Sequence, residues 1–192
     1  MVALAPPLRR AGPDDAAALA DLVNMAGEGL PEYLWRSMAA PGEDPWALGR
    51  QRQAQKAESG QIYVVDDGAG AVASLTGYTI PAVPEPIPDD LPAIFRPLQE
   101  LENLAPATWY VNVLAAYPAE RGRGHGTRLL ALAEALAGEA GLGAMSLIVA
   151  SANAGARQLY QRLGYAETAW RPLVTNGWHC DSAEWVLLVK RI

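Results

Sequence analysis

The sequence predicts a mixed α/β protein that folds as one domain. Runs rich in β-formers alternate with segments of helical periodicity along the 192 residues. Between residues 108 and 151 a strand, a glycine-rich loop, a helix and a second strand follow one another, which is the order of a βαβ unit. Neither a repeat nor a break in composition divides the chain. We therefore predict a single domain over residues 1–192, a length that can bury one core.

The composition is that of a globular, acidic protein. Hydrophobic residues make up 51% and charged residues 19% of the chain, which excludes a disordered protein. The formal net charge is -6 and the pI is near 4.9, so a nucleic acid is not expected as the main partner, because phosphates bind basic surfaces. No apolar stretch approaches the roughly 20 residues of a membrane span, and no membrane partner is expected.

Two features favour a cytoplasmic location. The N-terminus, "MVALAPPLRRAG", is short and interrupted by proline, and its arginines follow the apolar part, whereas a secretory signal has the opposite order. The single cysteine, Cys180, cannot form an internal disulfide, which agrees with a reducing compartment.

The first third of the chain is predicted to be mainly helical. A short strand leads into a helix whose start is marked by Pro13, Asp14 and Asp15. A later helix is opened by Asp44 and Pro45. The expected elements are a strand over 8–11 and helices over 12–26, 30–39 and 44–59.

A hairpin and a proline-rich loop are predicted next. Two β-rich runs over 61–80 flank "DDGAG", a sequence typical of a hairpin turn. The segment 81–92 is too rich in proline for regular structure and is expected to be an ordered surface loop or a lid that borders the acceptor site. A helix follows over 93–104, in which Pro97 is expected to be a weak point.

The C-terminal half carries the clearest pattern. The strands over 108–117 and 144–151 are separated by one helix, so they should be parallel with a right-handed crossover. The apolar run "AMSLIVAS" is typical of a strand buried on both faces. The remaining expected elements are helices over 127–141 and 153–165 and a final strand over 183–192.

The loop "RGRGHGTRLL" (121–130) joins the first of these strands to its helix. Free N–H groups and the helix dipole converge at such a junction, which favours a bound anion. The dinucleotide fingerprint fails at Thr127, where it needs a third glycine, and the P-loop fails because no lysine is near. The pattern Arg/Gln-x-x-Gly-x-Gly/Ala is matched by Arg121, Gly124 and Gly126.

These residues resemble the GNAT superfamily of N-acetyltransferases, which hold the pyrophosphate of acetyl-CoA with this loop. The resemblance covers about residues 100 to 170 and includes "NVLAAYPAERGRGHGTRLL" and "LIVASANAGARQLYQRLGY". It implies a three-layer α/β/α sandwich around a mixed, mostly antiparallel sheet of about six to seven strands with a splayed central parallel pair. Ala116 stands where the family often has valine.

The resemblance also implies the cofactor-binding residues. Backbone groups of two strand residues would pair with the pantetheine arm and polarise the thioester carbonyl. Asn153 would contact the cofactor, although capping the next helix explains it equally. His125 is expected to be a variable, exposed position within the loop. The full expected set is Leu114, Ala116, Arg121, Gly122, Arg123, Gly124, His125, Gly126, Thr127, Asn153 and Tyr160.

Two residues are expected to be catalytic. By the resemblance, Tyr160 would protonate the leaving thiolate, whereas its helical spacing alone would make it a core residue. Glu102 is our candidate for the base that takes the proton of the attacking amine, with Glu100 and Asn112 close to it in sequence. Surface helices carry glutamates for solubility as well, so this choice stays open.

The function predicted is acetyl transfer from acetyl-CoA to a primary amine by direct attack. His179 and Cys180 are neighbours whose side chains would point to opposite faces of a strand, so no thiol–imidazole dyad supports a covalent intermediate. Two histidines and one cysteine offer no zinc site. The alternative is a CoA-binding sensor or interaction domain without turnover. The acceptor is expected to be a small-molecule or peptide amine, and a homodimer is left open.

Overall fold

The computed structural model describes residues 2–192. The chain forms two compact units, the first made of residues up to Gly77 and of Val113–Ala131, the second of Tyr78–Asn112 and Leu132–Ile192. The chain passes from one unit to the other within β3 (Ala71–Thr79), β4 (Trp109–Ala116) and α5 (His125–Glu139). One domain over the whole chain stays a prediction.

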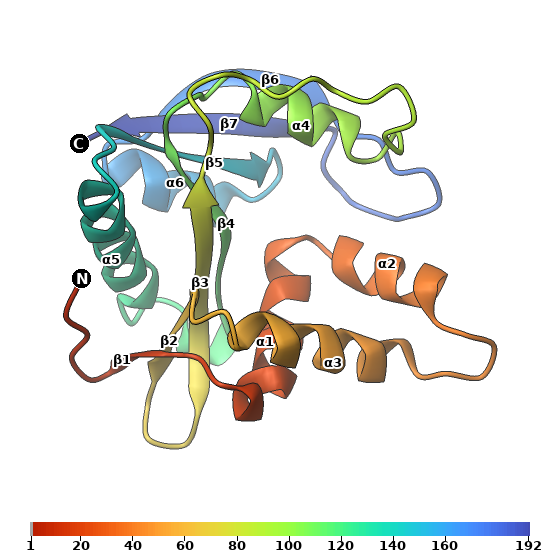
Figure 1. Cartoon of the computed structure of the whole chain (residues 1–192), viewed down its shortest axis with the longest axis horizontal. Coiled ribbons are helices and arrows are strands. Elements are labelled where there is room, and N and C mark those ends of the chain that lie inside the picture. Colours follow the sequence, from red (N-terminus) through yellow and green to blue (C-terminus); the bar gives the residue numbers. More distant parts are fainter. Residues whose placement is uncertain (1) are drawn as a thin grey trace. The chain divides into compact units, whose positions relative to one another are not determined.

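The strands form the mixed sheet that the sequence predicts. In residues 2–192 seven strands are hydrogen-bonded in the order β1-β2-β3-β4-β5-β7-β6 (Figure 1). β4 and β5 (Ala144–Ala150) run parallel, whereas β1–β2, β2–β3, β5–β7 and β6–β7 are antiparallel. The α/β fold class with a mostly antiparallel sheet and one parallel pair is therefore confirmed.

The first unit combines three antiparallel strands with three helices. β1 (Leu8–Arg10), β2 (Ile62–Asp66) and β3 are neighbours, and α1 (Ala16–Ala26), α2 (Leu30–Met38) and α3 (Pro45–Ala57) pack on one another (Figure 1). As predicted, Asp44 caps α3: its carboxylate accepts hydrogen bonds from the N–H groups of Trp46 and Ala47.

Helices α2 and α3 approach closely at a glycine. A Cβ atom added to Gly49 of α3 would lie 2.5 Å from Cε3 of Trp35 on α2. The indole of Trp35 is buried and meets Trp46 edge to face, with ring centroids 5.3 Å apart. Gly49 is therefore required by packing, which offsets the low helix propensity of glycine.

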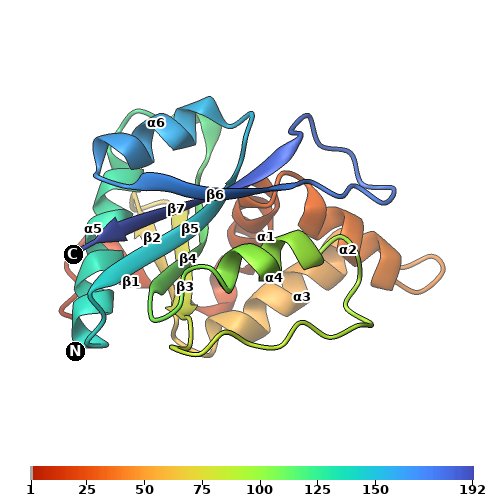
Figure 2. The ribbon, with the colours of Figure 1, turned by 90° about the horizontal axis from the view of Figure 1, so that it is seen from above.

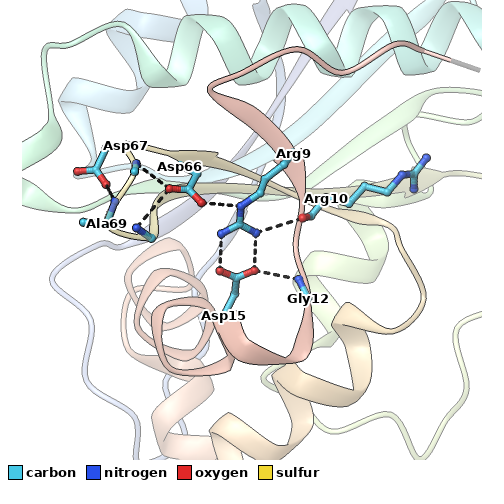
Figure 3. A network of polar contacts seen from close by, with 9 residues as sticks. Arg9, Arg10, Gly12, Asp15, Asp66, Asp67 and Ala69 are labelled. Carbon is cyan, nitrogen blue, oxygen red and sulfur yellow. Dashed lines mark hydrogen bonds and ion pairs between the residues drawn. The ribbon is translucent and has the colours of Figure 1, made fainter.

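An arginine ties β1 to the start of α1 and to the β2–β3 hairpin (Figure 3). The guanidinium of Arg9 binds Asp15 with two nitrogens, at 2.7 and 2.8 Å, and its Nε binds Asp66 at 2.6 Å. Asp66 in turn accepts hydrogen bonds from the N–H groups of Gly68 and Gly70 in the hairpin turn. The network connects β1 and the adjoining start of α1 to a hairpin 57 residues further along the chain.

The second unit contains the first part of β4, then β5, β7 (Glu184–Arg191) and β6 (Ala166–Pro172). Helix α4 (Arg96–Glu102) lies on one side of these strands and α6 (Ala154–Arg162) on the other (Figure 2). β5 is largely buried, as predicted. The fully buried core residues of this unit include Leu101, Met145, Leu147, Leu187 and Leu188.

Within the second unit, the parallel register of β4 and β5 pairs Trp109 with Met145 and Val111 with Leu147, and β5 is paired with β7 from Ala144 to Ala150. The splaying of the parallel pair stays a prediction. In the described part of the chain no helix is both long and apolar enough to span a bilayer.

Two sequence expectations are corrected. Pro97 lies in the first turn of α4, where a missing N–H costs nothing, so it starts the helix and does not weaken it. The strand β6 was not expected. Its residues are largely exposed, with Trp170 57% accessible, so it shows no buried alternation that would predict a strand.

Candidate active site

The glycine-rich loop adopts a backbone that only glycine takes easily. In the first unit, β4 leads through a short 3-10 helix (Pro118–Glu120) to Arg121, and φ is +78° at Gly122 and +83° at Gly124. A Cβ at either glycine would meet no atom within 4 Å. The space beside the bare backbone is therefore open to a ligand.

The start of α5 adds unpaired N–H groups. The first hydrogen bond of this helix runs from the N–H of Arg128 to the carbonyl of Gly124, at 3.0 Å. The N–H groups of residues 125–127 consequently have no intrahelical acceptor, and the positive end of the helix dipole lies at the same place. Arg121 and Arg123 add two exposed guanidinium groups. Together these groups suit a phosphate or diphosphate.

His125 differs from the expectation that it is exposed. Its side chain is only 11% accessible, and its Nε2 lies 3.3 Å from Oε2 of Glu120, which also accepts a hydrogen bond from Arg123 at 3.0 Å. Its Nδ1 is buried without a hydrogen-bond partner among residues 2–192. His125 and Arg123 thus both contact Glu120, which holds the loop in place, and the backbone of Gly122 and Gly124 faces the open space.

In the second unit, Asn153 forms the predicted helix cap. Its side-chain oxygen accepts a hydrogen bond from the N–H of Ala156 at 3.2 Å. At the other end of α6, Gly164 has a φ of +90°, a conformation that glycine supplies where a helix ends. The N–H of Tyr165 returns to the carbonyl of Tyr160, which fixes the last turn of the helix.

Tyr160 is the buried residue of α6. It is 6% accessible, and its ring meets that of Tyr165 with centroids 5.8 Å apart. Its hydroxyl forms no hydrogen bond in the described residues. Burial raises the pKa of this phenol, so it holds its proton at neutral pH. The side chain is thus both packed and available as a proton donor.

Glu102 lies at the end of α4 beside two tyrosines. The hydroxyl of Tyr78 donates a hydrogen bond to Oε2 of Glu102 at 3.0 Å. Burial raises the pKa of Glu102, and the carboxylate of Glu85 raises it further, while the bond from Tyr78 acts in the opposite direction. A carboxylate with a raised pKa is a better proton acceptor than an ordinary surface glutamate.

Tyr110 extends this group of side chains into the core of the second unit. Its ring lies against that of Tyr78, with centroids 5.2 Å apart. Burial raises the pKa of Tyr110 strongly, and the carboxylate of Glu102 raises it further. The hydrogen bond between Tyr78 and Glu102 and the ring contact between Tyr78 and Tyr110 join three of these side chains. We call Glu102, Tyr78 and Tyr110, together with Tyr160 of the same unit, the Tyr–Glu cluster.

Glu100 has a separate role. Its carboxylate binds Nε of Arg171 on β6 at 2.7 Å. It is thus engaged in an ion pair that links α4 to β6, and Glu102 alone of the two joins the cluster. Tyr78, Tyr110 and Glu85 were not singled out from the sequence. One available signal was that Tyr110 precedes Asn112 by two strand residues, a spacing that places both on one face.

The predicted site residues divide between the two units. The first unit carries Leu114, Ala116 and the loop 121–127, and the second carries Glu102, Asn153 and Tyr160. Within the second unit, Glu102 and Tyr160 belong to one cluster, whereas Asn153 caps the helix that bears Tyr160.

Solved structures with the same fold extend over nearly the whole chain. An acetyltransferase matches with a TM-score of 0.62 and 20% identity, covering 96% of this chain and 98% of its own. A mosquito arylalkylamine N-acetyltransferase like 5b matches at 0.63 and 18%, covering 96% and 99%. The ribosomal-protein-alanine N-acetyltransferase of Brucella melitensis matches at 0.60 and 18%, also covering 96% and 99%. At these identities the likeness shows the fold.

No curated protein matches the sequence. The acetyltransferase (GNAT) family profile, in contrast, matches residues 28–165, which include the glycine-rich loop, the Tyr–Glu cluster and Asn153. By its sequence, and in agreement with its fold, this chain is a member of the GNAT acetyltransferase family.

Proposed function

We propose that this acetyltransferase moves the acetyl group of acetyl-CoA to a primary amine by direct attack in a ternary complex. The observation that supports this best is the Tyr–Glu cluster. It combines a half-buried carboxylate of raised pKa with a buried phenol that keeps its proton. An acyl transfer from a thioester to an amine needs one proton acceptor and one proton donor of this kind.

The loop of the first unit fits the diphosphate of acetyl-CoA. Gly122 and Gly124 leave the backbone open, and the N–H groups at the start of α5 lack acceptors. Arg121, Arg123 and the N–H groups of residues 122–127 would neutralise and bind the two phosphates. Leu114, Ala116 and Asn153 are assigned to the cofactor by the family resemblance.

The chain itself would carry out two proton transfers, one to the carboxylate of Glu102 and one from the hydroxyl of Tyr160. The amine nitrogen attacks the thioester carbonyl carbon, the new C–N bond forms and the C–S bond breaks. The carboxylate of Glu102 takes the proton that the amine loses, directly or through water. The hydroxyl of Tyr160 gives a proton to the departing sulfur. The products are an amide and the free thiol of CoA.

The acceptor is proposed to be a small-molecule or peptide amine. The similar structures include an arylalkylamine N-acetyltransferase and a ribosomal-protein-alanine N-acetyltransferase, whose names cover both kinds of amine. The competing hypothesis, a CoA-binding sensor without turnover, requires no proton donor near the thioester.

The test is a panel of primary amines incubated with acetyl-CoA while free thiol is measured. The panel contains alkylamines, aralkylamines, amino acid amides and short peptides, and a sample without amine corrects for hydrolysis. Thiol release that depends on an amine, together with the acetylated product by mass spectrometry, supports the proposal. Tight CoA binding without amine-dependent release from any of them would establish the sensor instead.

A further inference from the structure

One carboxylate contacts both the glycine-rich loop and the helix that follows it. Glu120 is the last residue of the 3-10 helix before the loop. Its Oε2 accepts a hydrogen bond from Arg123 at 3.0 Å and lies 3.3 Å from Nε2 of His125, the first residue of α5. The side chains of Glu120 and His125 are 15% and 11% accessible. The carboxylate therefore links the segment before the loop to the middle of the loop and to the start of the helix.

The loop has few other contacts that would fix its conformation. In residues 2–192 no loop side chain besides those of Arg123 and His125 forms a hydrogen bond. Gly122 and Gly124 have positive φ and no Cβ, so their backbone is intrinsically free to move. A loop that becomes ordered only when its ligand binds loses conformational entropy, which weakens the observed affinity. The contacts of Glu120 reduce this loss because they order the loop beforehand.

The charge of Glu120 by itself should weaken the binding of a diphosphate. A carboxylate beside an anionic ligand repels it, and the guanidinium of Arg123 offsets this repulsion. Two effects of Glu120 therefore have opposite signs: its charge disfavours an anionic cofactor, and the loop geometry that it holds favours one. The sign of the change in affinity when Glu120 is removed shows which effect is larger.

The imidazole of His125 gives independent support for a positioning role. A carboxylate only accepts hydrogen bonds, so Nε2 of His125 is the donor to Glu120. Nδ1 of the same ring is buried without a partner in residues 2–192. A buried polar atom without a partner is costly, and an apolar side chain at this position would avoid that cost. The bond to Glu120 is what the loop gains from having a histidine here.

We propose that Glu120 is a positioning residue for the cofactor: by holding His125 and Arg123, it keeps the loop 121–127 in its binding conformation before acetyl-CoA arrives. This inference rests on the proposed binding of the CoA diphosphate by the loop, and it names a residue outside the set expected from the sequence. In this role Glu120 does not touch the cofactor. It acts through Arg123 and His125, which flank Gly124, whose backbone faces the open space.

The experiment measures the dissociation constant of CoA by calorimetry in wild type and in variants of Glu120. Glu120→Ala removes both contacts and should raise the dissociation constant about tenfold, although it also removes a negative charge. Glu120→Gln keeps an oxygen that accepts the bond from His125 and should stay within about threefold of wild type. Asp181→Ala is the matched control: it removes the carboxylate of an exposed pair with His179, 3.2 Å apart, and should leave CoA binding unchanged.

A double-mutant cycle isolates the contact between Glu120 and His125. His125→Ala alone should raise the dissociation constant of CoA about threefold to tenfold. The combined variant should bind CoA about as weakly as Glu120→Ala, because the contact is already lost in either single variant. Fully additive effects would show that the two residues act separately and would contradict the proposal.

Kinetics and salt separate positioning from charge. With an accepted amine, Glu120→Ala should raise KM for acetyl-CoA and leave kcat at saturating acetyl-CoA unchanged, because the loop contacts are equally present before and during the reaction. The ratio of the dissociation constants of Glu120→Ala and wild type should persist in about 0.5 M salt, where exposed charges are screened. A fall in kcat with KM unchanged would contradict a role in cofactor binding.

The failures of the two proposals are distinguishable. Absence of CoA binding to wild type overturns the proposed function and the positioning role together. CoA binding that is as tight or tighter in Glu120→Ala than in wild type overturns only the positioning role, because the carboxylate would then act by its charge alone. An equal loss in Glu120→Gln and Glu120→Ala also overturns it, since the amide retains the bond to His125. If a thermal melt shows that Glu120→Ala does not fold, His125→Ala decides, and wild-type affinity in that variant overturns the proposal.

Discussion

Tyr160 combines a well-packed ring with a hydroxyl that forms no hydrogen bond in residues 2–192. Tyr160→Phe keeps the packing and removes only the hydroxyl, so the melting temperature should stay the same or rise slightly. If the phenol protonates the thiolate, kcat should fall about a hundredfold, with the affinity for CoA unchanged. Steady-state kinetics beside a thermal melt measures both. A variant that melts several degrees lower at full activity would make Tyr160 a packing residue only.

Replacing Glu102 by glutamine should lower the catalytic rate without lowering the free energy of unfolding. Because its pKa is raised in the folded protein, its contribution to stability is present below the unfolded pKa and is lost as pH rises through the folded pKa. At neutral pH, Glu102→Gln should therefore unfold no more easily than wild type, since the amide oxygen still accepts the bond from Tyr78.

In Glu102→Gln, the increase of kcat/KM with pH on the acidic side of the profile should be absent. In wild type, kcat/KM should rise with pH as Glu102 ionises, and Glu102→Gln should lower the rate about a hundredfold and remove this rise. Glu100→Gln is the matched control, because it removes only the charge that pairs with Arg171 and leaves Glu102 unchanged. A pH profile that is the same in Glu102→Gln as in wild type would show that another group takes the proton.

The choice of Glu102 over Glu100 illustrates why residue roles are hard to predict. The two glutamates are two positions apart on a helix, so they point in different directions. Which of them meets Tyr78 and which meets Arg171 depends on the rotation of α4 against the strands. The sequence pointed to both glutamates, and only the packing of α4 shows that Glu102 contacts Tyr78 and Glu100 contacts Arg171.

At the scale of elements, the Arg9 network joins β1, the start of α1 and the β2–β3 hairpin (Figure 3). Asp15→Asn removes the charge that the guanidinium binds with two nitrogens, and should lower the free energy of unfolding by about 1–3 kcal/mol. Asp14→Asn removes a charge at the adjacent position and should have little effect. Urea unfolding of both variants beside wild type gives the comparison.

The difference should disappear in acid. Arg9 lowers the pKa of Asp15, so the stabilisation is present above the unfolded pKa and is lost as pH falls through the folded pKa. Wild type and Asp15→Asn should therefore converge well below pH ~4. A difference that persists unchanged in strong acid would mean that shape, and not charge, makes Asp15 important.

Elements with local signals were predicted and the others were not. The helix caps at Asp44 and Asn153 depend on neighbouring residues alone, and both are present. β6 pairs only with β7 and is largely exposed, so its strand state comes from its partner. Pro97 was misjudged because its effect depends on where the helix begins.

At the scale of the whole molecule, ligand binding should appear as added stability. CoA at a hundred times its dissociation constant would stabilise the protein by about 2.7 kcal/mol, which raises the melting temperature by several degrees. Gly124→Glu places a side chain and a negative charge in the open space of the loop and should abolish the shift. Gly138→Glu makes the same charge change later in α5, where a Cβ also meets nothing, and should retain it.

The dissociation constant of CoA, measured by calorimetry in Gly124→Glu and in Gly138→Glu, decides whether the loop binds the cofactor. Gly124 has a positive φ, so a lower melting temperature of the unliganded variant is itself expected and does not count as evidence. Equal CoA affinity in folded Gly124→Glu and in Gly138→Glu would show that the loop does not hold the phosphates.

The sequence by itself determined the class of this protein. Its strand, glycine-rich loop and helix are specified by neighbouring residues, because positive φ, helix starts and caps are local properties. The fold class and the GNAT family followed from that segment, and both are confirmed. The tertiary structure decided which side chains lie together. Tyr78, Glu102, Tyr110 and Tyr160 come from four separate segments, and they meet only because strand register and helix packing fix each one. Register and packing depend on the whole chain at once, so no local pattern could have placed the Tyr–Glu cluster.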